Sequence, residues 1–291
     1  MITVIAGPTA SGKTALAIEV AKRRGAEIIS ADSQQVYRFF DIGTAKPSAE
    51  ELAAVPHHLI SCVDPIFDFS AAHYQRLADA AIGEIVARGR EVVVVGGTGM
   101  YLRILLHGVV DAPGSDDALR ADLEKLESAE LHSRLRVVDP VTADRLPVAD
   151  RVRMIRALEI HQLTGKAASV HRAEHAFAAD RHPHRLWVLA PERESLYPII
   201  NERAQRMFDA GLVGEVKALV DRGFRDAAPM SSVGYAQALA CLDGSMTRDQ
   251  AIADTAMKSR HYAKRQVTWF KKESGAGFIR PPYAEALVSS R

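Results

Sequence analysis

The chain has 291 residues, of which 47% are hydrophobic and 25% are charged, a composition typical of soluble globular proteins. This length favours about two domains, or one large domain with an insertion. The 37 Lys and Arg residues nearly balance the 36 Asp and Glu residues, giving a net charge of +1. A polyanionic partner must therefore be held by a local basic patch, not by the field of the whole molecule.

Three further features bear on membrane association and cellular location. No apolar run approaches the ~20 residues that a transmembrane helix requires, so no membrane span is predicted. The first predicted strand begins directly after Met1, and we therefore expect no signal peptide. Cys62 and Cys241 fit a reducing compartment better than a disulfide framework. We expect a cytoplasmic protein.

The N-terminal segment MITVIAGPTASGKT contains the phosphate-loop motif G-x-x-x-x-G-K-[ST]. The apolar run 2–6 predicts a buried strand before the motif, and apolar residues at helical spacing predict a helix after it. Glycines let the loop turn tightly, and its N–H groups and the helix dipole favour a phosphate or diphosphate. Lys13 adds a positive charge, and the Thr14 hydroxyl is the candidate metal ligand, for Mg²⁺. The candidate phosphate-binding residues are Gly7, Pro8, Thr9, Ala10, Ser11, Gly12, Lys13 and Thr14.

Two further strands are predicted to end at the same crevice. Residues 27–31 predict a strand followed by Asp32, which is either an ordinary turn residue or a metal ligand or base beside the phosphate loop. Residues 92–95 predict a buried strand followed by Gly-Gly-Thr-Gly, which places Thr98 at the crevice. Motor-type NTPases usually end this strand with an Asp that holds Mg²⁺. Gly96 stands there instead, which favours a transferase over an ATPase or GTPase.

The residue composition and the predicted secondary structure change between two parts of the chain. Residues 111–184 are rich in charge and helical signals without a convincing strand, whereas strand character returns at 186–190. We therefore predict a helical insertion over 113–184 within a core formed by 1–112 and 185–291.

Within the insertion, Asp150 is predicted to cap a helix that ends at Gly165. Residues 171–184 contain several histidines, and His171 and His175 have i,i+4 spacing. We interpret this segment as a polar loop, because no cysteine or paired carboxylate completes a metal site. In the core, we predict a loop over 40–47 and a short strand over 58–63. We also predict a helix over 71–89 that is capped by Ser70, and three later helices over 195–210, 212–222 and 248–272.

The end of the last helix combines basic and aromatic residues. Residues 258–272 read KSRHYAKRQVTWFKK and contain no acidic residue. A solvated cationic helix face with aromatic residues in the core is the commoner arrangement for such a pattern. Beside a phosphate loop in a nearly neutral protein, the same cluster is also a candidate contact for a polyanion.

The order of these motifs resembles that of the tRNA dimethylallyltransferase family. The segments are GPTASGKT, ADSQQVY, DIGTAKP, VVGGTGMY, RMIRALEI followed by TGK, SVGY and YAKRQVTWF, and they run from residue 7 to about 271. The resemblance implies an α/β fold, with a P-loop NTPase-like core of parallel sheet flanked by helices. It also implies that the mostly helical insertion contacts the anticodon stem-loop of tRNA.

The resemblance also implies a reaction. A dimethylallyl group moves from dimethylallyl diphosphate, the co-substrate, to N6 of the adenine 3′-adjacent to the anticodon. This reaction fits the phosphate loop, because adenine N6 is a weak nucleophile and a loop that holds diphosphate stabilises the leaving group. Mg²⁺ is the implied cofactor.

The implied catalytic residues are Asp32, Lys13, Thr14, Thr98 and Arg203. Asp32 takes or orients the N6 proton, and Thr98 contacts the flipped nucleotide. Arg203 lies near the diphosphate, although a helix-surface arginine is the alternative interpretation. The implied tRNA-binding residues are Asp32, Ser33, Gln34, Gln35, Thr98, Val152, Arg153, Met154, Ile155, Arg156, Ser231, Ser232, Val233, Gly234, Tyr235, Ala236, Lys264, Arg265, Gln266, Val267, Thr268, Trp269, Phe270 and Lys271.

The chain departs from the family pattern at Ser231, Ala236 and Ser259, which puts individual tRNA contacts in question more than the reaction. A small-molecule or nucleoside kinase that uses ATP at the same loop is the main alternative. An RNA-binding NTPase module without transferase chemistry is a third, although the absence of a carboxylate after Val95 speaks against it. We expect a monomer that binds tRNA and no membrane.

Overall fold

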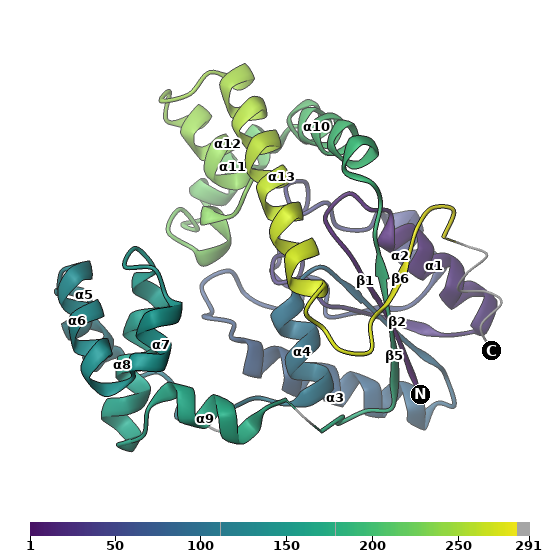
Figure 1. The fold of residues 1–291 in the computed structure, drawn as a ribbon. Helices are drawn as coiled ribbons and strands as arrows, with labels where there is room; N and C mark the ends of the chain where they lie inside the picture. Colours follow the sequence, from purple (N-terminus) through teal and green to yellow (C-terminus); the bar gives the residue numbers. More distant parts are fainter. Residues whose placement is uncertain (111, 178, 284–291) are drawn as a thin grey trace. The chain divides into compact units, whose positions relative to one another are not determined.

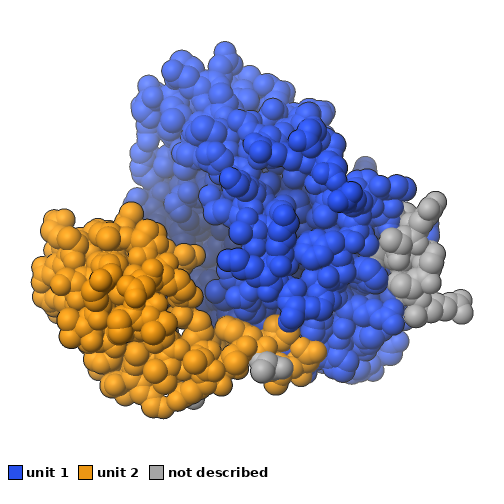
Figure 2. All heavy atoms as spheres, in the orientation of Figure 1, with its two compact units in different colours: residues 1–106, 181–291 blue, residues 107–180 orange. Residues whose placement is uncertain are grey.

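The computed structural model describes residues 1–110, 112–177 and 179–283 (Figure 1). The chain divides into two compact units (Figure 2). Unit 1 comprises Met1–Leu106 and Arg181–Arg291, and unit 2 comprises His107–Asp180. Unit 2 is therefore a single insertion in the sequence of unit 1: the chain leaves unit 1 after residue 106 and returns to it at residue 181.

Unit 1 is built on a six-stranded sheet with the order β3-β2-β4-β1-β5-β6. All neighbouring strands are parallel, which confirms the predicted α/β class. The register pairs Ala6 with Gly96 and Ser30 with Val95, so the carboxyl ends of β1, β4 and β2 are level. The strands are β1 (Ile2–Ala6), β2 (Glu27–Ser30), β3 (His57–His58), β4 (Val92–Gly96), β5 (His184–Leu189) and β6 (Gly277–Ile279).

Helices cover both faces of the sheet. Val4, Ile29 and Val94 point to the face that packs against α3 (Ala71–Ala87) and α4 (Gly99–His107). Ile5, Ile28 and Val93 point to the opposite face, which packs against α1 (Lys13–Arg24). Because both faces are buried, these strands read as continuous apolar runs rather than alternating ones.

Among the remaining helices of unit 1, α10, α11 and α13 follow the predicted ones closely, whereas α2, α12 and a 3₁₀ turn were not predicted. Thr247 and Gln250 form the predicted capping box at the start of α13, and Ser70 caps α3. α10 contains Pro198 inside its span. These elements are α2 (Ala49–Ala54), α10 (Arg193–Asp209), α11 (Leu212–Asp221), a 3₁₀ turn at Ala228–Ser231, α12 (Tyr235–Leu242) and α13 (Arg248–Phe270).

Two strand predictions differ from the structure. The strand predicted over 58–63 is only the two residues of β3, because Leu59 and Ser61 adopt positive φ angles of 62° and 50° that end an extended strand. β6 was not predicted, since it has three residues and begins with a glycine. Gly277 lies against the Trp187 ring, where an added Cβ would come within 2.9 Å.

The described residues of unit 2 contain helices and turns without a strand. A core of leucines and Met154 joins α6 and α8, and Asp150 and Gly165 cap α8 as predicted. Buried Glu159 accepts hydrogen bonds from the Arg120 and Arg156 guanidinium groups. Besides the end of α4, the helices are α5 (Asp117–Glu124), α6 (Ser128–Val138), α7 (Pro140–Arg145), α8 (Arg151–Thr164) and α9 (Ala168–His175).

The predicted polar loop over 171–184 is wrong at its beginning, where α9 extends to His175. Two anchors hold this helix: Ala168 is buried in the core of unit 2, and the Ser169 N–H donates to Asp139 Oδ2 at 2.9 Å. His171 contacts the Thr164 hydroxyl, and His175 Nδ1 accepts from the Phe177 N–H. Across the part of the chain that the structure describes, no helix combines the length and apolarity needed to cross a bilayer.

Candidate active site

The phosphate loop between β1 and α1 is held in a conformation with left-handed residues. Ala10 has a φ angle of 63° and Gly12 has one of 84°, and Gly12 is the N-cap of α1. The carbonyl of Pro8 accepts from the Ser11 N–H at 3.3 Å and from Lys13 Nζ at 3.4 Å. The loop therefore folds back on itself and brings the Lys13 ammonium beside the positive end of a helix.

Two cations are desolvated beside this loop. Burial, followed by the nearby Arg203 charge, lowers the pKa of Lys13 to about 8, and Asp32 partly opposes the shift. Burial also lowers the pKa of Arg203, against the effect of Asp32. Among the described residues, no salt bridge joins Lys13 or Arg203 to a carboxylate. Buried cations without a bonded counter-ion are costly, so this arrangement is suited to an anionic ligand.

Asp32 follows β2 and is oriented by the backbone. Its Oδ1 accepts from the N–H groups of Gln34 at 2.9 Å and Gln35 at 3.3 Å, which forms a turn at the end of the strand. The Thr98 hydroxyl oxygen accepts from the Ser33 N–H at 3.0 Å. Thr98 itself follows β4, so the loops after two neighbouring strands support one another and fix the Asp32 carboxylate.

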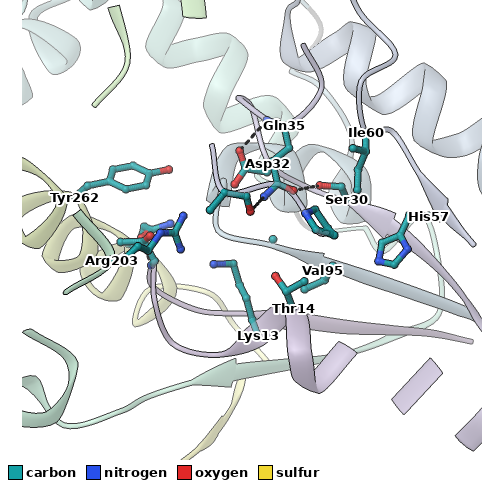
Figure 3. A pocket seen from close by; sticks show the side chains of 15 residues that line it. Lys13, Thr14, Ser30, Asp32, Gln35, His57, Ile60, Val95, Arg203 and Tyr262 are labelled. Carbon is teal, nitrogen blue, oxygen red and sulfur yellow. Dashed lines mark hydrogen bonds between the residues drawn. The ribbon is translucent and has the colours of Figure 1, made fainter. Parts of the chain in front are cut away.

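Two adjoining cavities share Thr9, Asp32, Arg203 and Tyr262 in their walls. Figure 3 shows Lys13, Arg203 and Asp32 turned toward a common space. The smaller cavity, about 60 Å³, adds Lys13, Thr14, Ser30 and His57, and the larger, about 310 Å³, adds Ser33, Gln34, Ser231, Ser232, Val233, Ser259 and Arg265. The site thus has a phosphate-loop end and a wider end, with Asp32 and Arg203 at their junction.

Comparison with known proteins decides the family. A family model described as IPP transferase matches residues 35–273, which is most of the chain. The tRNA dimethylallyltransferase of Myxococcus xanthus is 63% identical over 99% of this chain and 94% of its own. The enzyme of the same name from Anaeromyxobacter dehalogenans is 49% identical over 100% of this chain and 96% of its own.

The chain belongs to the IPP transferase family.

Solved structures agree with this assignment and confirm the P-loop type of core. A tRNA isopentenylpyrophosphate transferase of Bacillus halodurans superimposes with a TM-score of 0.73 and 38% identity, covering 99% of this chain and 93% of that one. A eukaryotic dimethylallyltransferase acting on tRNA superimposes with a TM-score of 0.83 and 28% identity, covering 96% and 73%. The resemblance found in the sequence motifs is therefore confirmed.

In this IPP transferase, the structure brings together the predicted catalytic residues from four segments. Lys13, Thr14, Asp32 and Arg203 line the cavities. Thr98 lines neither of these two cavities, and its hydroxyl oxygen accepts a hydrogen bond from the N–H of Ser33, the neighbour of Asp32. Arg203 is half-buried and lines both cavities, so it faces the site rather than the outer surface of its helix.

The predicted RNA-binding residues at the end of α13 divide into two faces. Lys264, Arg265, Thr268 and Lys271 are exposed, whereas Gln266 and Phe270 are only 5% and 1% exposed. Trp269 lies under the Arg103 guanidinium, 4.3 Å from the ring centroid. This helix of the IPP transferase therefore offers one basic face to solvent and uses the other face within unit 1.

The other predicted RNA-binding segments are also partly engaged within their own units. On α8, Met154 and Ile155 are buried, and Arg156 bonds Glu159 and the Pro113 and Gly114 carbonyls. Val152 and Arg153 are exposed, and Arg153 pairs with Asp150 at 2.9 Å.

The segment from Ser231 to Ala236 contains one fully buried side chain. The Tyr235 hydroxyl donates to Glu215 and accepts from the Gly43 N–H. Ser231, Ser232 and Val233 line the wider cavity, so the first three residues of this segment face the site.

Two site residues were not identified from the sequence. Tyr262 lines both cavities, and burial, followed by Asp32, raises its pKa to about 12. His57 lines the smaller cavity; its Nδ1 lies 2.7 Å from the Val55 carbonyl, and its buried Nε2 has no hydrogen-bond partner among the described residues. Tyr262 was visible only as an aromatic residue in a basic helix, and His57 carried no signal, since it precedes the strand predicted over 58–63.

Proposed function

We propose that this protein transfers a dimethylallyl group from dimethylallyl diphosphate to N6 of the adenine 3′-adjacent to the tRNA anticodon. The products are N6-isopentenyladenosine in tRNA and diphosphate. The observation that carries this proposal is a pair of cations near the Asp32 carboxylate: Lys13 lines the smaller cavity, and Arg203 lies with Asp32 at the junction of the two cavities. Membership of the IPP transferase family supports the same reaction.

The phosphate-loop end of the site stabilises the leaving group. As the C–O bond of the donor breaks, negative charge grows on the diphosphate. The N–H groups at the start of α1 and the Lys13 ammonium face that charge in a small cavity, where donors already held in place stabilise developing charge. Arg203 adds a second cation on the side nearer the reacting carbon.

The Asp32 end of the site serves the acceptor. The lone pair of adenine N6 is delocalised into the ring, so removal of an N6 proton during transfer assists bond formation. The Asp32 carboxylate, oriented by two backbone N–H groups, is the general base for that proton, a role worth about 10²–10⁴-fold in rate. The wider cavity admits a base flipped out of its stack, and a single-stranded loop lowers the cost of flipping.

The residues at the phosphate-loop end also fit a magnesium ion. The Thr14 hydroxyl and Ser30 line the small cavity beside the unpartnered Nε2 of His57, which suits a hydrated cation whose waters donate hydrogen bonds. Thr14 would hold the ion and His57 one of its waters. When bound, the ion would neutralise part of the diphosphate charge.

The RNA is the substrate in this proposal. The exposed basic residues of α13 contact its backbone, and the helical insertion, for which the structure gives the bounds 107–180 instead of the predicted 113–184, grips the anticodon stem-loop, while unit 1 carries the chemistry. Ser33, Gln34, Ser231, Ser232 and Val233, which line the wider cavity, contact the flipped nucleotide and its neighbours. The protein acts in the cytoplasm as a monomer.

The kinase alternative uses the same loop for ATP and Asp32 as a base for a hydroxyl acceptor. A kinase acting on a small molecule would have no ligand for the exposed basic face of α13. It also lacks the carboxylate that often holds Mg²⁺ at the end of the strand beside the phosphate loop, since β4 ends in Gly96.

A transfer assay tests the function directly. The protein is incubated with radiolabelled dimethylallyl diphosphate, Mg²⁺ and tRNA that lacks the modification, and the RNA is digested to nucleosides. We expect label in N6-isopentenyladenosine from the position next to the anticodon. Unlabelled RNA, with transfer or hydrolysis of the ATP γ-phosphate in a parallel reaction, would overturn the proposal in favour of the kinase.

A further inference from the structure

Gln266, near the end of α13, is a buried glutamine whose amide bonds two different loops. Its Oε1 accepts from the Thr9 N–H at 2.8 Å, and its Nε2 donates to the Gly97 carbonyl at 2.8 Å. The side chain is 5% exposed. Thr9 belongs to the phosphate loop after β1, and Gly97 belongs to the turn after β4. One amide thus joins the loops at the ends of two neighbouring strands.

The chemistry of the contact requires an amide of this length. One loop offers a donor and the other an acceptor, and a glutamine carries one group of each kind at the end of its side chain. An apolar side chain of similar length would leave the Thr9 N–H and the Gly97 carbonyl without this partner. A buried polar group that loses its hydrogen bond is destabilised, so both loops would shift to find new partners.

The packing around Gly97 shows how closely the amide is seated. A Cβ added at Gly97 would lie 2.2 Å from Gln266 Nε2 and 3.3 Å from the Gly7 carbonyl oxygen. Any side chain at this position would push the amide away from the turn. The contact between Gln266 and this turn therefore depends on glycine at position 97.

The two loops joined by Gln266 lead to opposite ends of the site. On one side, Thr9 follows Pro8, whose carbonyl accepts from Lys13 Nζ. On the other side, Gly97 precedes Thr98, whose hydroxyl oxygen accepts from the N–H of Ser33, the neighbour of Asp32. A continuous series of bonds therefore runs from the diphosphate cradle through Gln266 to the general base.

We propose that Gln266 is a positioning residue that fixes the separation between the diphosphate cradle and the Asp32–Thr98 end of the site. The proposal rests on the transfer reaction proposed above. It differs from the role that the family resemblance gives this residue, which is RNA contact. A displacement of about 1 Å between reacting groups costs roughly 10²-fold in rate, so the separation of the two ends governs turnover.

Gln266→Met tests the proposal, with Gln205→Met on the exposed face of α10 as the matched control. We expect Gln266→Met to lower kcat about 30- to 100-fold. The Kd for diphosphate, from calorimetry, and the Kd for tRNA, from filter binding, stay within about threefold, because neither ligand contacts the amide in this proposal. Gln205→Met leaves all three values unchanged. Thermal unfolding and circular dichroism verify that each variant is folded.

Gly97→Ala approaches the same contact from the other loop. We expect a similar loss of kcat, and a double variant whose loss is clearly smaller than the product of the two single losses, because both changes break one contact. Independent, multiplying losses would overturn the proposal.

Two other outcomes also overturn it. A weaker tRNA Kd with normal kcat at saturating tRNA would return Gln266 to the RNA-contact role. A diphosphate Kd that rises as much as kcat falls would place it in the cradle instead.

Hydrogen exchange of the Thr9 amide separates failure of this proposal from failure of the proposed reaction. We expect strong protection of that amide in the unaltered protein and faster exchange in Gln266→Met, whether or not the protein transfers a prenyl group. Equal exchange in both proteins would show that the bond does not hold the loop.

Discussion

The two ends of the site are built in different ways. The phosphate-loop end comes from one continuous segment, in which backbone N–H groups, a helix terminus and Lys13 meet a ligand charge that is the same for any diphosphate. The acceptor end comes from side chains of segments far apart in the sequence, among them Asp32, Arg203 and Tyr262.

This difference separates binding from chemistry. In the proposed reaction, a cradle made mainly of backbone groups holds the diphosphate almost regardless of single side chains, with Lys13 as the exception. The acceptor end depends on the relative placement of a few side chains, which is set by packing and by contacts such as those of Gln266. Mutations at the two ends should therefore have different signatures.

The largest expected effect comes from the acceptor end. Asp32→Asn keeps the size of the side chain and removes the base, so we expect kcat to fall about 10³-fold. The Kd for diphosphate stays within about threefold, since the cradle does not use Asp32. Single-turnover transfer and calorimetry measure the two quantities. Near-normal turnover would show that Asp32 is not the general base.

Lys13 gives the cradle a pH dependence. Its pKa in the free protein is lowered to about 8 by burial and by Arg203, so it is charged below pH 8 and neutral above it. Diphosphate binds the charged form, and we expect the affinity to fall as pH rises through 8, by up to tenfold per pH unit. Calorimetry between pH 7 and pH 9.5 measures this slope.

Lys13→Met is the control for that slope, because it keeps the ionisation of the ligand and removes that of the lysine. We expect weaker binding at pH 7 and a flatter profile. Identical slopes in both proteins would assign the pH dependence to the ligand.

His57 tests the magnesium part of the cradle. Because its buried Nε2 has no partner among the described residues, we expect His57→Ala to raise the Mg²⁺ concentration needed for half-maximal diphosphate binding about fivefold. His58→Gln is the neighbouring control. His58 bonds Glu27 at 2.7 Å, so that change should lower thermal stability without altering the Mg²⁺ requirement. An unchanged Mg²⁺ titration in His57→Ala would remove His57 from the metal site.

The smallest effect is expected on the RNA-facing side of the acceptor end. Lys264→Ala on the exposed face of α13 should weaken tRNA binding roughly threefold and reduce the salt dependence of the Kd by about one phosphate contact. Diphosphate binding should not change. Lys217→Ala, which removes an exposed lysine paired with Asp221 on α11, is the matched control. A salt slope identical to that of the unaltered protein would take Lys264 out of the RNA interface.

The sequence was most informative where a structural feature depends on residues that are close together in the chain. The phosphate loop, the strand before Asp32 and the capping box at Thr247 all depend on neighbouring residues, and each was predicted correctly. Tyr262 and His57 were missed because their roles arise from what folding places beside them. The strand predicted at 58–63 is wrong because Leu59 and Ser61 adopt positive φ angles, which the pattern of apolar residues in the sequence does not reveal.

The way in which unit 1 closes at the insertion point has a consequence for protein engineering. The Arg181 N–H donates to the Leu106 carbonyl at 2.7 Å, and the Arg181 guanidinium bonds Asp79 of α3. The chain therefore leaves and re-enters unit 1 at adjacent, anchored points. A short turn could join residues 106 and 181 directly, so the intervening segment is a replaceable cassette. Under the proposed function, in which this segment grips the RNA, exchange of homologous cassettes would retarget one catalytic core to other RNA hairpins.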